Sequence, residues 1–436
     1  MNPEYINGFS KLDTEQKIEL LTDKNQLEQV KKLLRDFKIN DPETQKIFES
    51  FSENSISNFH LPYGIAPNFL VDGSLFHVPM AVEESSVVAA ASKSAKFWYD
   101  KGGFQTVFIK KIKSGQIHFT FDGGIDILQS HFEAIKESLL QSAKEITKRM
   151  EARGGGIREI KLIDKRDKLE DYYQLLITFD TADSMGANFI NSCLEAMGVS
   201  LQEFMNSAPG LKDYSFEIIM AILSNYTPES IIRMKVETSL DNLNDIAPHT
   251  EGRAFAEKFQ KAVEIARHDV FRATTHNKGI MNGIDAVVIA TGNDFRAVEA
   301  AAHAYAARNG SYASLSECFI DKYTFRYELE IPLSLGTVGG LTSLHPLADF
   351  SIKFLDSPSA EQLMKITAAA GLANNFGAIR SLVTEGIQKG HMKLHLDNIL
   401  LKFNASPIEK QRAKSYFADK KVSYANVKDF LDEQRS

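Results

Sequence analysis

The chain has 436 residues, a formal net charge of −7 at pH 7 and a hydrophobic fraction of 43%. This length allows two or three domains with cores of their own, and the composition is that of a folded globular protein. The negative charge argues against a nucleic-acid binder that works by bulk electrostatic attraction, and no apolar stretch is long enough to cross a membrane. Because the N-terminal residues show no targeting pattern, we expect a cytoplasmic protein with no membrane or nucleic-acid partner.

The cysteines and histidines predict neither a disulfide nor a metal site. Cys193 and Cys318 occur in unlike contexts and form no CxxC pair, so we expect two reduced, buried thiols. His391 and His395 stand at helical i,i+4 spacing, but no glutamate completes the usual metal-binding pattern. We therefore expect no metal.

The first hundred residues alternate between helical and extended patterns. Residues 13–35 place leucines at helical spacing among charges, which predicts a surface helix. In residues 61–80, Pro62, Pro67, Gly73 and Pro79 separate apolar pairs, which predicts loops and short strands. In residues 83–86 two glutamates and two serines precede an alanine-rich run, which predicts a helix N-terminus capped by serine.

A different pattern follows Gly102 and Gly103. Strands are predicted on either side of a Ser114-Gly115 turn, and two helices and further strands follow them. The predicted elements are strands 104–112, 116–121, 157–164, 172–180 and 214–222 and helices 126–152 and 184–205. Their order contains a split βαβ pattern, so we expect a ferredoxin-like domain over 104–222, inserted into a larger domain.

Helices predominate in the expected structure from residue 251 to 435. Asp294 stands before a predicted helix over 295–308, in the position of an N-cap. The glycines at 336, 339 and 340 predict a loop, and the C-terminal residues read as three short helices, the first beginning close to Gly390-His391.

The segment from Arg272 to Asp294 is the most informative one. It places polar and charged side chains among glycines and a short apolar run, at Arg272, His276, Lys278, Asn282, Asp285 and Asp294. Core segments rarely carry so many groups that need partners, so we interpret the segment as a partly buried polar site. Lys278 alone allows two chemistries, a Schiff-base lysine of the pyridoxal type or a cation that stabilises an oxyanion.

The other candidates have plain alternatives. Glu84 and Asp294 can be acids at helix N-termini, and His391 can be an exposed histidine on a terminal helix. No GxGxxG, GxxxxGK[ST], HExxH or GxSxG motif occurs. Motifs therefore predict neither a Rossmann or P-loop protein nor a zincin or serine hydrolase.

Six blocks, taken together, resemble one enzyme family. They are ENSISNFHLPYGIAPNF (53–69), VPMAVEESSVVAAAS (78–92), DSMGAN (183–188), RATTHNKGIMNGIDAVVIATGNDFRAVEAAAHAYA (272–306), GTVGGLTSLHPLA (336–348) and TEGIQKGHM (384–392). They are similar to hydroxymethylglutaryl-coenzyme A reductase, in particular its soluble, class II bacterial branch. The resemblance implies a reductase that interconverts hydroxymethylglutaryl-coenzyme A with mevalonate and coenzyme A by two hydride transfers through a mevaldehyde-level intermediate.

The resemblance implies four catalytic residues. Glu84 would supply a proton at the aldehyde step, and the Lys278 ammonium would stabilise the oxygen that becomes negative. Asp294 would hold both in a shared hydrogen-bond network, and His391 would protonate the departing thiolate. Because a helix N-terminus and a lysine both favour a charged carboxylate, burial or coupling to Asp294 has to offset them at Glu84.

The substrate and cofactor residues are implied in the same way. Arg272, Ser86 and Asn282 would bind the hydroxymethylglutaryl group, and Glu53 is carried over as a further substrate-binding position. The pyrophosphate would lie near Asp183, Met185, Gly186, Ala187 and Asn188, and the adenosine ribose near Thr147, Lys148 and Arg149. Thr147 stands where family members that prefer NAD have an acid, and two cations follow it, so NADPH is favoured over NADH.

The expected fold class is α+β. A large substrate-binding domain (1–103 and 223–376) would surround the inserted dinucleotide domain (104–222), and a helical flap (377–436) would carry His391. The family's active sites form between subunits, so a homodimer or a multiple of it is expected. Ser57 stands where the family has glycine, which predicts an altered backbone at that interface. A pyridoxal lysine enzyme and a non-catalytic binder of coenzyme A esters stay as alternatives, and the direction of the reaction in the cell stays open.

Overall fold

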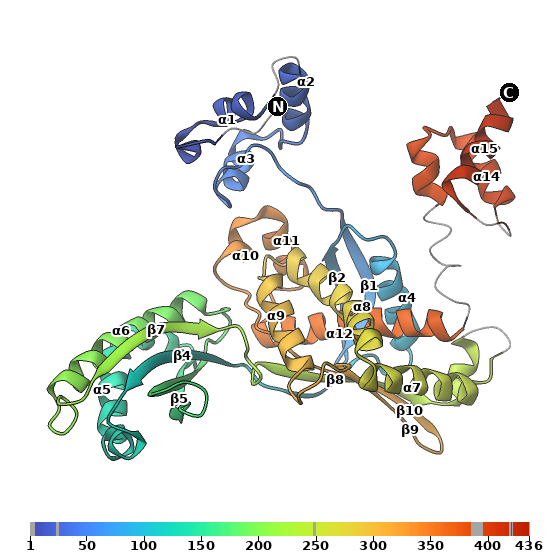
Figure 1. The fold of residues 1–436 in the computed structure, drawn as a ribbon. Helices are drawn as coiled ribbons and strands as arrows, with labels where there is room; N and C mark the ends of the chain where they lie inside the picture. The colour runs from blue at the N-terminus through green and yellow to red at the C-terminus, as the bar shows by residue number, and fades with distance from the viewer. Residues whose placement is uncertain are drawn as a thin grey trace.

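The computed structural model describes residues 5–22, 26–246, 250–384, 396–417, 420 and 422–435. These residues form a main body, a unit inserted into it, and a group of helices towards each end of the chain (Figure 1). Within the described residues no helix is long and apolar enough to cross a membrane.

The N-terminal helices form a small group beside the main body. They are η1 (Phe9–Lys11), α1 (Thr14–Leu21), α2 (Leu27–Asp36) and α3 (Pro42–Glu49). The single helix predicted over 13–35 is wrong, because Thr22 is extended and ends α1 before α2 begins. Phe48 and Phe51 place their ring centroids 4.9 and 5.8 Å from that of His345, and these contacts join α3 and the turn that follows it to the main body.

A long hairpin replaces the loops and short strands predicted for 61–80. Strands β1 (Tyr63–Val71) and β2 (Ser74–Ala81) pair antiparallel around Asp72 and Gly73, which both have positive φ, as a tight hairpin turn requires. A register shift between Ala66 and Phe69 accommodates a proline within β1. The hairpin packs against α4 (Val87–Tyr99).

The main body contains one four-stranded antiparallel sheet covered by helices. Its strand order is β3-β8-β10-β9, from β3 (Gln105–Ile109), β8 (Ile231–Ser239), β10 (Thr324–Pro332) and β9 (Ser316–Ile320). The sequence did not predict β8, which lies in a stretch without any predicted element. It did not predict β9 or β10 either, since helices were expected to predominate from residue 251 onward. The remaining elements are η2 (Asp241–Ile246), α7 (Gly252–His268), α8 (Val270–Ala290), α9 (Phe295–Ala306), α10 (Leu341–Leu344), α11 (Pro346–Phe354) and α12 (Ala360–Val383).

Glycines let α8 lie directly against α12. A Cβ at Gly283 would stand 2.4 Å from the carbonyl oxygen of Ala370, and one at Gly371 would stand 2.7 Å from the Ile284 side chain. Larger residues would push the helices apart, so these glycines determine which face of α8 is buried.

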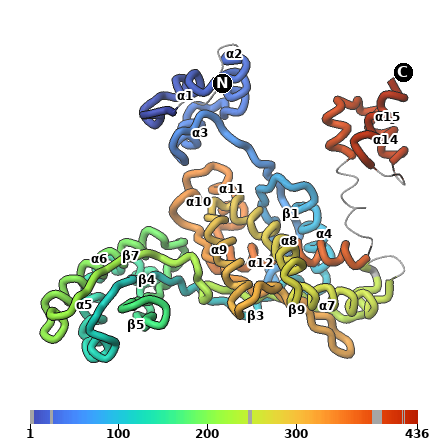
Figure 2. Tube along the Cα trace, in the orientation of Figure 1, coloured from blue at the N-terminus to red at the C-terminus, as the bar shows by residue number. Residues whose placement is uncertain are grey.

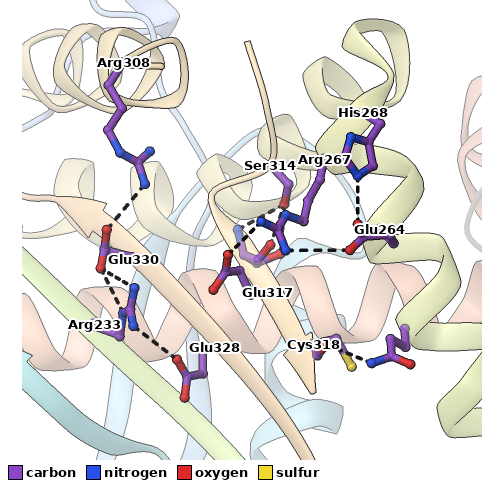
Figure 3. A network of polar contacts seen from close by, with 12 residues as sticks. Arg233, Glu264, Arg267, His268, Arg308, Ser314, Glu317, Cys318, Glu328 and Glu330 are labelled. Atoms are coloured by element: carbon purple, nitrogen blue, oxygen red, sulfur yellow. Dashed lines mark hydrogen bonds and ion pairs between the residues drawn. The ribbon is translucent and has the colours of Figure 1, made fainter. Parts of the chain in front are cut away.

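Ion pairs hold the far end of α9 to the sheet (Figure 3). Glu330 on β10 accepts from Arg233 of β8 at 2.7 Å and from Arg308, just beyond α9, at 3.5 Å. The Tyr305 hydroxyl of α9 donates to the same carboxylate at 2.5 Å. Because the opposite end of α9 begins next to Asp294, this network also restrains the position of that residue.

The inserted unit is ferredoxin-like, as the sequence predicted. Its strands pair in the order β5-β6-β4-β7, and its two helices pack on each other and on the sheet around a core of their own. The elements are β4 (Ile112–Phe121), α5 (Ile125–Glu151), β5 (Gly156–Asp164), β6 (Tyr172–Asp180), α6 (Ala187–Ser207) and β7 (Phe216–Ser224).

The entry to this unit differs from the prediction. The Ser114-Gly115 turn is wrong, since both residues lie inside β4 and pair with β6 and β7. Strand β3 pairs with β8 of the main body, and Lys110 and Ile231 exchange backbone hydrogen bonds of 2.9 Å. Figure 2 shows the two connections between the inserted unit and the main body running close together. We therefore propose that the inserted unit comprises residues 112–224, and not 104–222.

The C-terminal helices have a separate core. Residues 396–402 are helical, and α14 (Pro407–Tyr416) and α15 (Tyr424–Arg435) follow. Their apolar side chains form a cluster distinct from those of the main body and the inserted unit. Because α12 continues to Val383 with buried residues along its length, 377–383 belong to the main body, and we propose that the C-terminal unit starts after Thr384.

Candidate active site

A cleft of about 950 Å³ lies between the inserted unit and the main body. The inserted unit contributes residues near the C-terminus of α5 and the N-terminus of α6. The main body contributes the residues between α8 and α9 and the glycine-rich loop predicted at 336–340. The lining residues are Leu61, Glu83, Met150, Arg153, 184–189, Ile289, 292–296, Gly336, 338–342 and His345.

The start of α6 forms one wall of the cleft. Gly186 has a φ of 90°, and a Cβ there would stand 2.3 Å from the Thr181 side chain, so the position requires glycine. The first N–H groups of a 21-residue helix lack intrahelical partners and lie at the positive end of its dipole. This wall therefore suits an anionic group.

Four of the five residues predicted near the pyrophosphate line this wall, namely Met185, Gly186, Ala187 and Asn188. Asp183 has a different position. Its Oδ1 accepts from the backbone N–H of Ala360 at 2.8 Å, and its carbonyl accepts from that of Thr337 at 2.8 Å. Asp183 therefore ties the loop to the main body.

The residues predicted near the ribose do not line the cleft in the described structure. Thr147 belongs to the buried face of α5 with 3% exposure, and its hydroxyl donates to the Lys144 carbonyl. Its role at the adenosine ribose stays a prediction. Lys148 and Arg149 are exposed but lie outside the cleft lining. Met150, in the last turn of α5, and Arg153, just beyond the helix, line the cleft instead.

Lys278 and Glu84 form an ion pair beside this cleft: neither residue lines it, but the neighbouring Glu83 does. Lys278 Nζ stands 2.5 Å from Glu84 Oε2, which brings together α8 and the turn before α4. Their side chains remain 58% and 40% exposed. The structure thus joins two of the four predicted catalytic residues, 194 positions apart in the chain.

One face of α8 extends from this ion pair to the cleft. Lys278, Asn282, Asp285 and Ile289 follow each other at steps of four, three and four residues, which places them on one side of the helix. Ile289 lines the cleft, and Asn282 and Asp285 are half-buried. Burial and the neighbouring Glu299 carboxylate raise the pKa of Asp285 to about 8.

The opposite face of α8 is structural. His276 is fully buried, and its Nε2 stands 2.6 Å from the Ser316 hydroxyl. Burial lowers the pKa of His276 to about 3, with a smaller contribution from Arg272. Asn277 donates to the carbonyl of Ala313 and accepts from the N–H of Leu315. The polar segment seen in the sequence therefore divides into a packing face and a face that remains available to a ligand.

Asp294 caps α9 at the other end of α8. Its carboxylate accepts from the backbone N–H groups of Arg296 and Ala297 and from the Arg296 guanidinium at 3.0 Å. Burial raises the pKa of Asp294, but the hydrogen bonds from Arg296 and Ala297 outweigh it and lower the pKa overall. The helix-cap interpretation of Asp294 is thus correct, and the residue also lines the cleft.

Lys278 and Asp294 are too far apart to share a hydrogen bond within one chain. Twelve helical steps put about 18 Å between the Cα atoms of Lys278 and Ala290. Beyond Ala290 the chain returns only as far as Val288, whose carbonyl accepts from the N–H of Asn293 at 2.9 Å. A network of Glu84, Lys278 and Asp294 would therefore need residues from two chains.

The predicted acyl-binding residues lie at several places. Arg272 is half-buried on α8, where burial lowers the pKa of its guanidinium. Ser86 precedes α4, but it has a φ of 79° and its side chain does not cap the helix, so the predicted serine cap is wrong. Glu53 is exposed in the segment between α3 and β1, and the hydroxyl of the nearby Ser57 donates to the Leu34 carbonyl at 2.6 Å.

Comparison with known proteins decides the family. The model of the family described as hydroxymethylglutaryl-coenzyme A reductase matches residues 13–396. The chain belongs to this family. It is 37% identical to 3-hydroxy-3-methylglutaryl-coenzyme A reductase of Archaeoglobus fulgidus, over 99% of this chain and 95% of that protein. A probable 3-hydroxy-3-methylglutaryl-coenzyme A reductase of Borreliella burgdorferi is 32% identical, over 94% and 93%.

A solved structure extends the likeness to three dimensions. The class II 3-hydroxy-3-methylglutaryl-CoA reductase of Streptococcus pneumoniae, bound to NADPH in open conformations, has a TM-score of 0.71 and 33% identity, covering 98% of this chain and 100% of that chain. The predicted class II reductase, its oxidoreductase chemistry and its α+β fold class are thereby confirmed. The comparisons lend no support to a pyridoxal lysine enzyme or a non-catalytic binder.

Some predicted residues lie outside the described structure, and some cleft residues were missed. His391 and His395 belong to the first group, and the described residues contain no group of three or more potential metal ligands. Both cysteines are free; Cys193 is buried and Cys318 half-buried. Arg153 was missed because it follows the expected ribose-binding stretch by one helical turn, a spacing that helical periodicity could have revealed.

Proposed function

We propose that this member of the hydroxymethylglutaryl-coenzyme A reductase family reduces hydroxymethylglutaryl-coenzyme A to mevalonate and coenzyme A with NADPH. The observation that carries the proposal is the Lys278–Glu84 ion pair at one end of the polar face of α8, whose other end reaches the cleft. The NADPH bound to the Streptococcus pneumoniae enzyme supports the choice of cofactor. The predicted cytoplasmic location and the direction of the reaction in the cell stay predictions.

The groups that line the cleft are suited to binding a dinucleotide. The α6 N-terminus, with Gly186 and Ala187, would bind the pyrophosphate, and the exposed guanidinium of Arg153 would meet a 2′-phosphate on the adenosine ribose. When bound, the dinucleotide supplies the hydride for each reduction step.

Lys278 and Glu84 would have separate roles in the reduction. The Lys278 ammonium would face the thioester oxygen and stabilise the negative charge that develops as hydride arrives. Glu84 Oε2, held 2.5 Å from Lys278 Nζ, would deliver a proton to the oxygen at the aldehyde level. Asn282, one turn along α8, would orient the acyl group. His391 would protonate the thiolate sulfur, a role that rests on the family resemblance.

We further propose that two subunits complete each active site. The cleft and Asp294 of one chain would face Lys278, Glu84 and the polar face of α8 of another. Two features support this arrangement, the separation of Lys278 from Asp294 along α8 and the exposure of the Lys278–Glu84 pair in the single chain. A homodimer is the smallest assembly that provides it.

The test is the absorbance of reduced nicotinamide after addition of hydroxymethylglutaryl-coenzyme A. We expect consumption of NADPH at a greater rate than of NADH. Lys278→Ala should lower kcat by roughly 10²–10³-fold, as expected for loss of an oxyanion-stabilising group. Lys261→Ala, on the surface of α7, serves as the control and should retain full activity. Consumption of neither cofactor would favour a non-catalytic binder of coenzyme A esters.

A further inference from the structure

A buried lysine lies directly behind the cleft wall formed by the start of α6. Lys113 is the second residue of β4 and is only 4% exposed. Its Nζ donates to Thr181 Oγ1 at 2.7 Å and to the carbonyl oxygens of Ser184 and Met185, each at 2.8 Å. A lysine ammonium has three N–H groups and a neutral amine has two, so three acceptors match the charged form.

This cation has no carboxylate in contact among the described residues. Burial lowers the pKa of the Lys113 ammonium to about 7, and attraction to Asp180, which is itself bound by Arg158 at 3.1 Å, opposes this shift only in part. Buried charges are normally paired or bound to other polar groups, and here the partners are two loop carbonyls and a hydroxyl. When Lys113 is protonated, no carboxylate in contact neutralises its charge, which lies directly behind the loop.

The contacts of Lys113 determine how the loop faces the cleft. Thr181 links the two, because its hydroxyl accepts from Lys113 and donates to the Ser184 carbonyl at 2.6 Å. In a trans peptide the N–H points opposite to the carbonyl. Since the carbonyls of Ser184 and Met185 point to Lys113, the N–H groups of Met185 and Gly186 point away from it. Without Lys113 these carbonyls could turn towards the cleft, where their oxygens would repel an anion.

We propose that Lys113 is a positioning residue for the dinucleotide, whose three hydrogen bonds orient the 184–186 loop and whose ammonium lies behind the pyrophosphate-binding wall. The proposal rests on the proposed function in one respect, that the dinucleotide binds in this cleft. It goes further by assigning a role to a residue that does not line the cleft. A merely structural role for Lys113 would affect all ligands and the stability of the protein together.

The test compares Lys113→Met in the full-length protein with Lys161→Met, an exposed lysine on β5 of the same unit. Direct titration, followed by the fluorescence of reduced nicotinamide, measures the affinity for NADPH and NADH. We expect Lys113→Met to weaken both about tenfold or more, as for loss of charge-assisted hydrogen bonds around a charged ligand. The KM for hydroxymethylglutaryl-coenzyme A and kcat at saturating NADPH should change less than about twofold. Lys161→Met should match the wild type in every measurement.

A second pair of ligands and a second variant complete the test. ADP, which carries the pyrophosphate, should lose affinity for Lys113→Met as the dinucleotides do, whereas adenosine should not. If Lys113→Met fails to fold, Thr181→Val keeps the side-chain shape, removes one acceptor and should weaken dinucleotide binding in the same direction. Unchanged affinity for NADPH in a folded variant, or equal losses for adenosine and the acyl substrate, would overturn the proposal. Failure of the wild-type protein to bind either dinucleotide would instead contradict the proposed function.

Discussion

Asp285 is a carboxyl group on the polar face of α8 whose protonation is linked to folding. Burial and Glu299 raise its pKa from 3.8 to about 8, so the folded chain binds this proton more tightly than the unfolded chain. The contribution of Asp285 to the free energy of unfolding is therefore fully present below its pKa in the unfolded chain, and it is lost as the pH rises through its pKa in the folded chain. The substitution Asp285→Asn replaces the carboxyl group by an amide that does not ionise, so it removes this loss of stability at high pH.

We expect Asp285→Asn to be more stable than the wild type above pH 8, by roughly 1–3 kcal/mol, and to show a smaller decline between pH 4 and 8. Urea unfolding at a series of pH values measures the difference. The control is Asp349→Asn, at a surface pair with Lys353, which should leave the pH dependence unchanged. Parallel stability curves for Asp285→Asn and the wild type would show that the pair does not hold a proton in the folded state.

Arg153 lies two residues beyond the end of α5 and lines the cleft, and it tests the choice between NADPH and NADH. Its guanidinium is exposed and has only weak contacts on its own helix, with the Arg149 carbonyl at 3.3 Å and Met150 sulfur at 3.9 Å. Arg153→Ala should raise the KM for NADPH about tenfold and leave that for NADH nearly unchanged, because only NADPH carries the 2′-phosphate. Lys148→Ala, five residues earlier and outside the cleft lining, is the matched control. Equal effects on both cofactors would remove Arg153 from the 2′-phosphate site.

For single residues, the sequence predicted which side chains belong to the site better than it predicted where those side chains point. Lys278 and Glu84 were predicted from the family resemblance, and the structure brings them to 2.5 Å. Thr147 matched a family position equally well, but helical packing turns its side chain into the core. The position of Lys113 behind the cleft wall could not be predicted, because its partners are two backbone carbonyls and a hydroxyl about seventy residues later. Every residue has a backbone carbonyl, so the sequence does not show which of them bind a side chain.

Among the elements, β4 shows why local patterns failed where tertiary packing decides. Ser114 and Gly115 resemble a turn, but Gly115 lies in the strand under α6, where a Cβ would stand 2.6 Å from Leu194. Close packing against α6 therefore explains the glycine, and a local sequence pattern cannot reveal such packing. The periodic elements of the same unit, such as the helix predicted over 126–152, agreed with the structure to within a residue at each end.

The C-terminal helices and α12 provide a prediction about a removable element. Helix α12 is buried along its length up to Val383, whereas the helices from 396 onward pack around a core of their own. A chain that ends at Thr384 should therefore fold, with a free energy of unfolding close to that of the full chain, and should bind NADPH. It should lack turnover, because the family resemblance assigns the thiolate's proton donor to His391.

Circular dichroism, dinucleotide titration and a turnover assay test this truncation together. The matched control is full-length His391→Ala, which should lose turnover with the C-terminal helices in place. Full activity in the shortened chain would exclude a catalytic role for the C-terminal unit. An unfolded product would show that the division after Thr384 is wrong.

At the scale of the whole molecule, the chain separates its chemistry into two places. The cleft with Asp294 lies at the C-terminal end of α8, and Lys278 pairs with Glu84 near the middle of the helix. The sequence could predict the members of both groups but not this separation, since it depends on α8 being a straight connection between them. Under the proposed sharing of each active site between two subunits, this separation is the reason why a single chain would lack a complete site.

Mixed dimers of two inactive variants test whether active sites are shared between subunits. Lys278→Ala and Asp294→Ala should each be inactive as homodimers, since every site would lack one group. In a mixed dimer one site would lack both groups and the other would be intact. Random mixing makes half of the dimers mixed, so co-expression should restore about a quarter of the wild-type activity. The control is co-expression of Lys278→Ala with Glu84→Ala. In the proposed arrangement both residues come from the same chain, so every site of a mixed dimer would still lack one of them and no activity should be restored. No recovery with Asp294→Ala, in dimers shown to be mixed, would mean that each site lies within one chain and that α8 has to bend or break before catalysis.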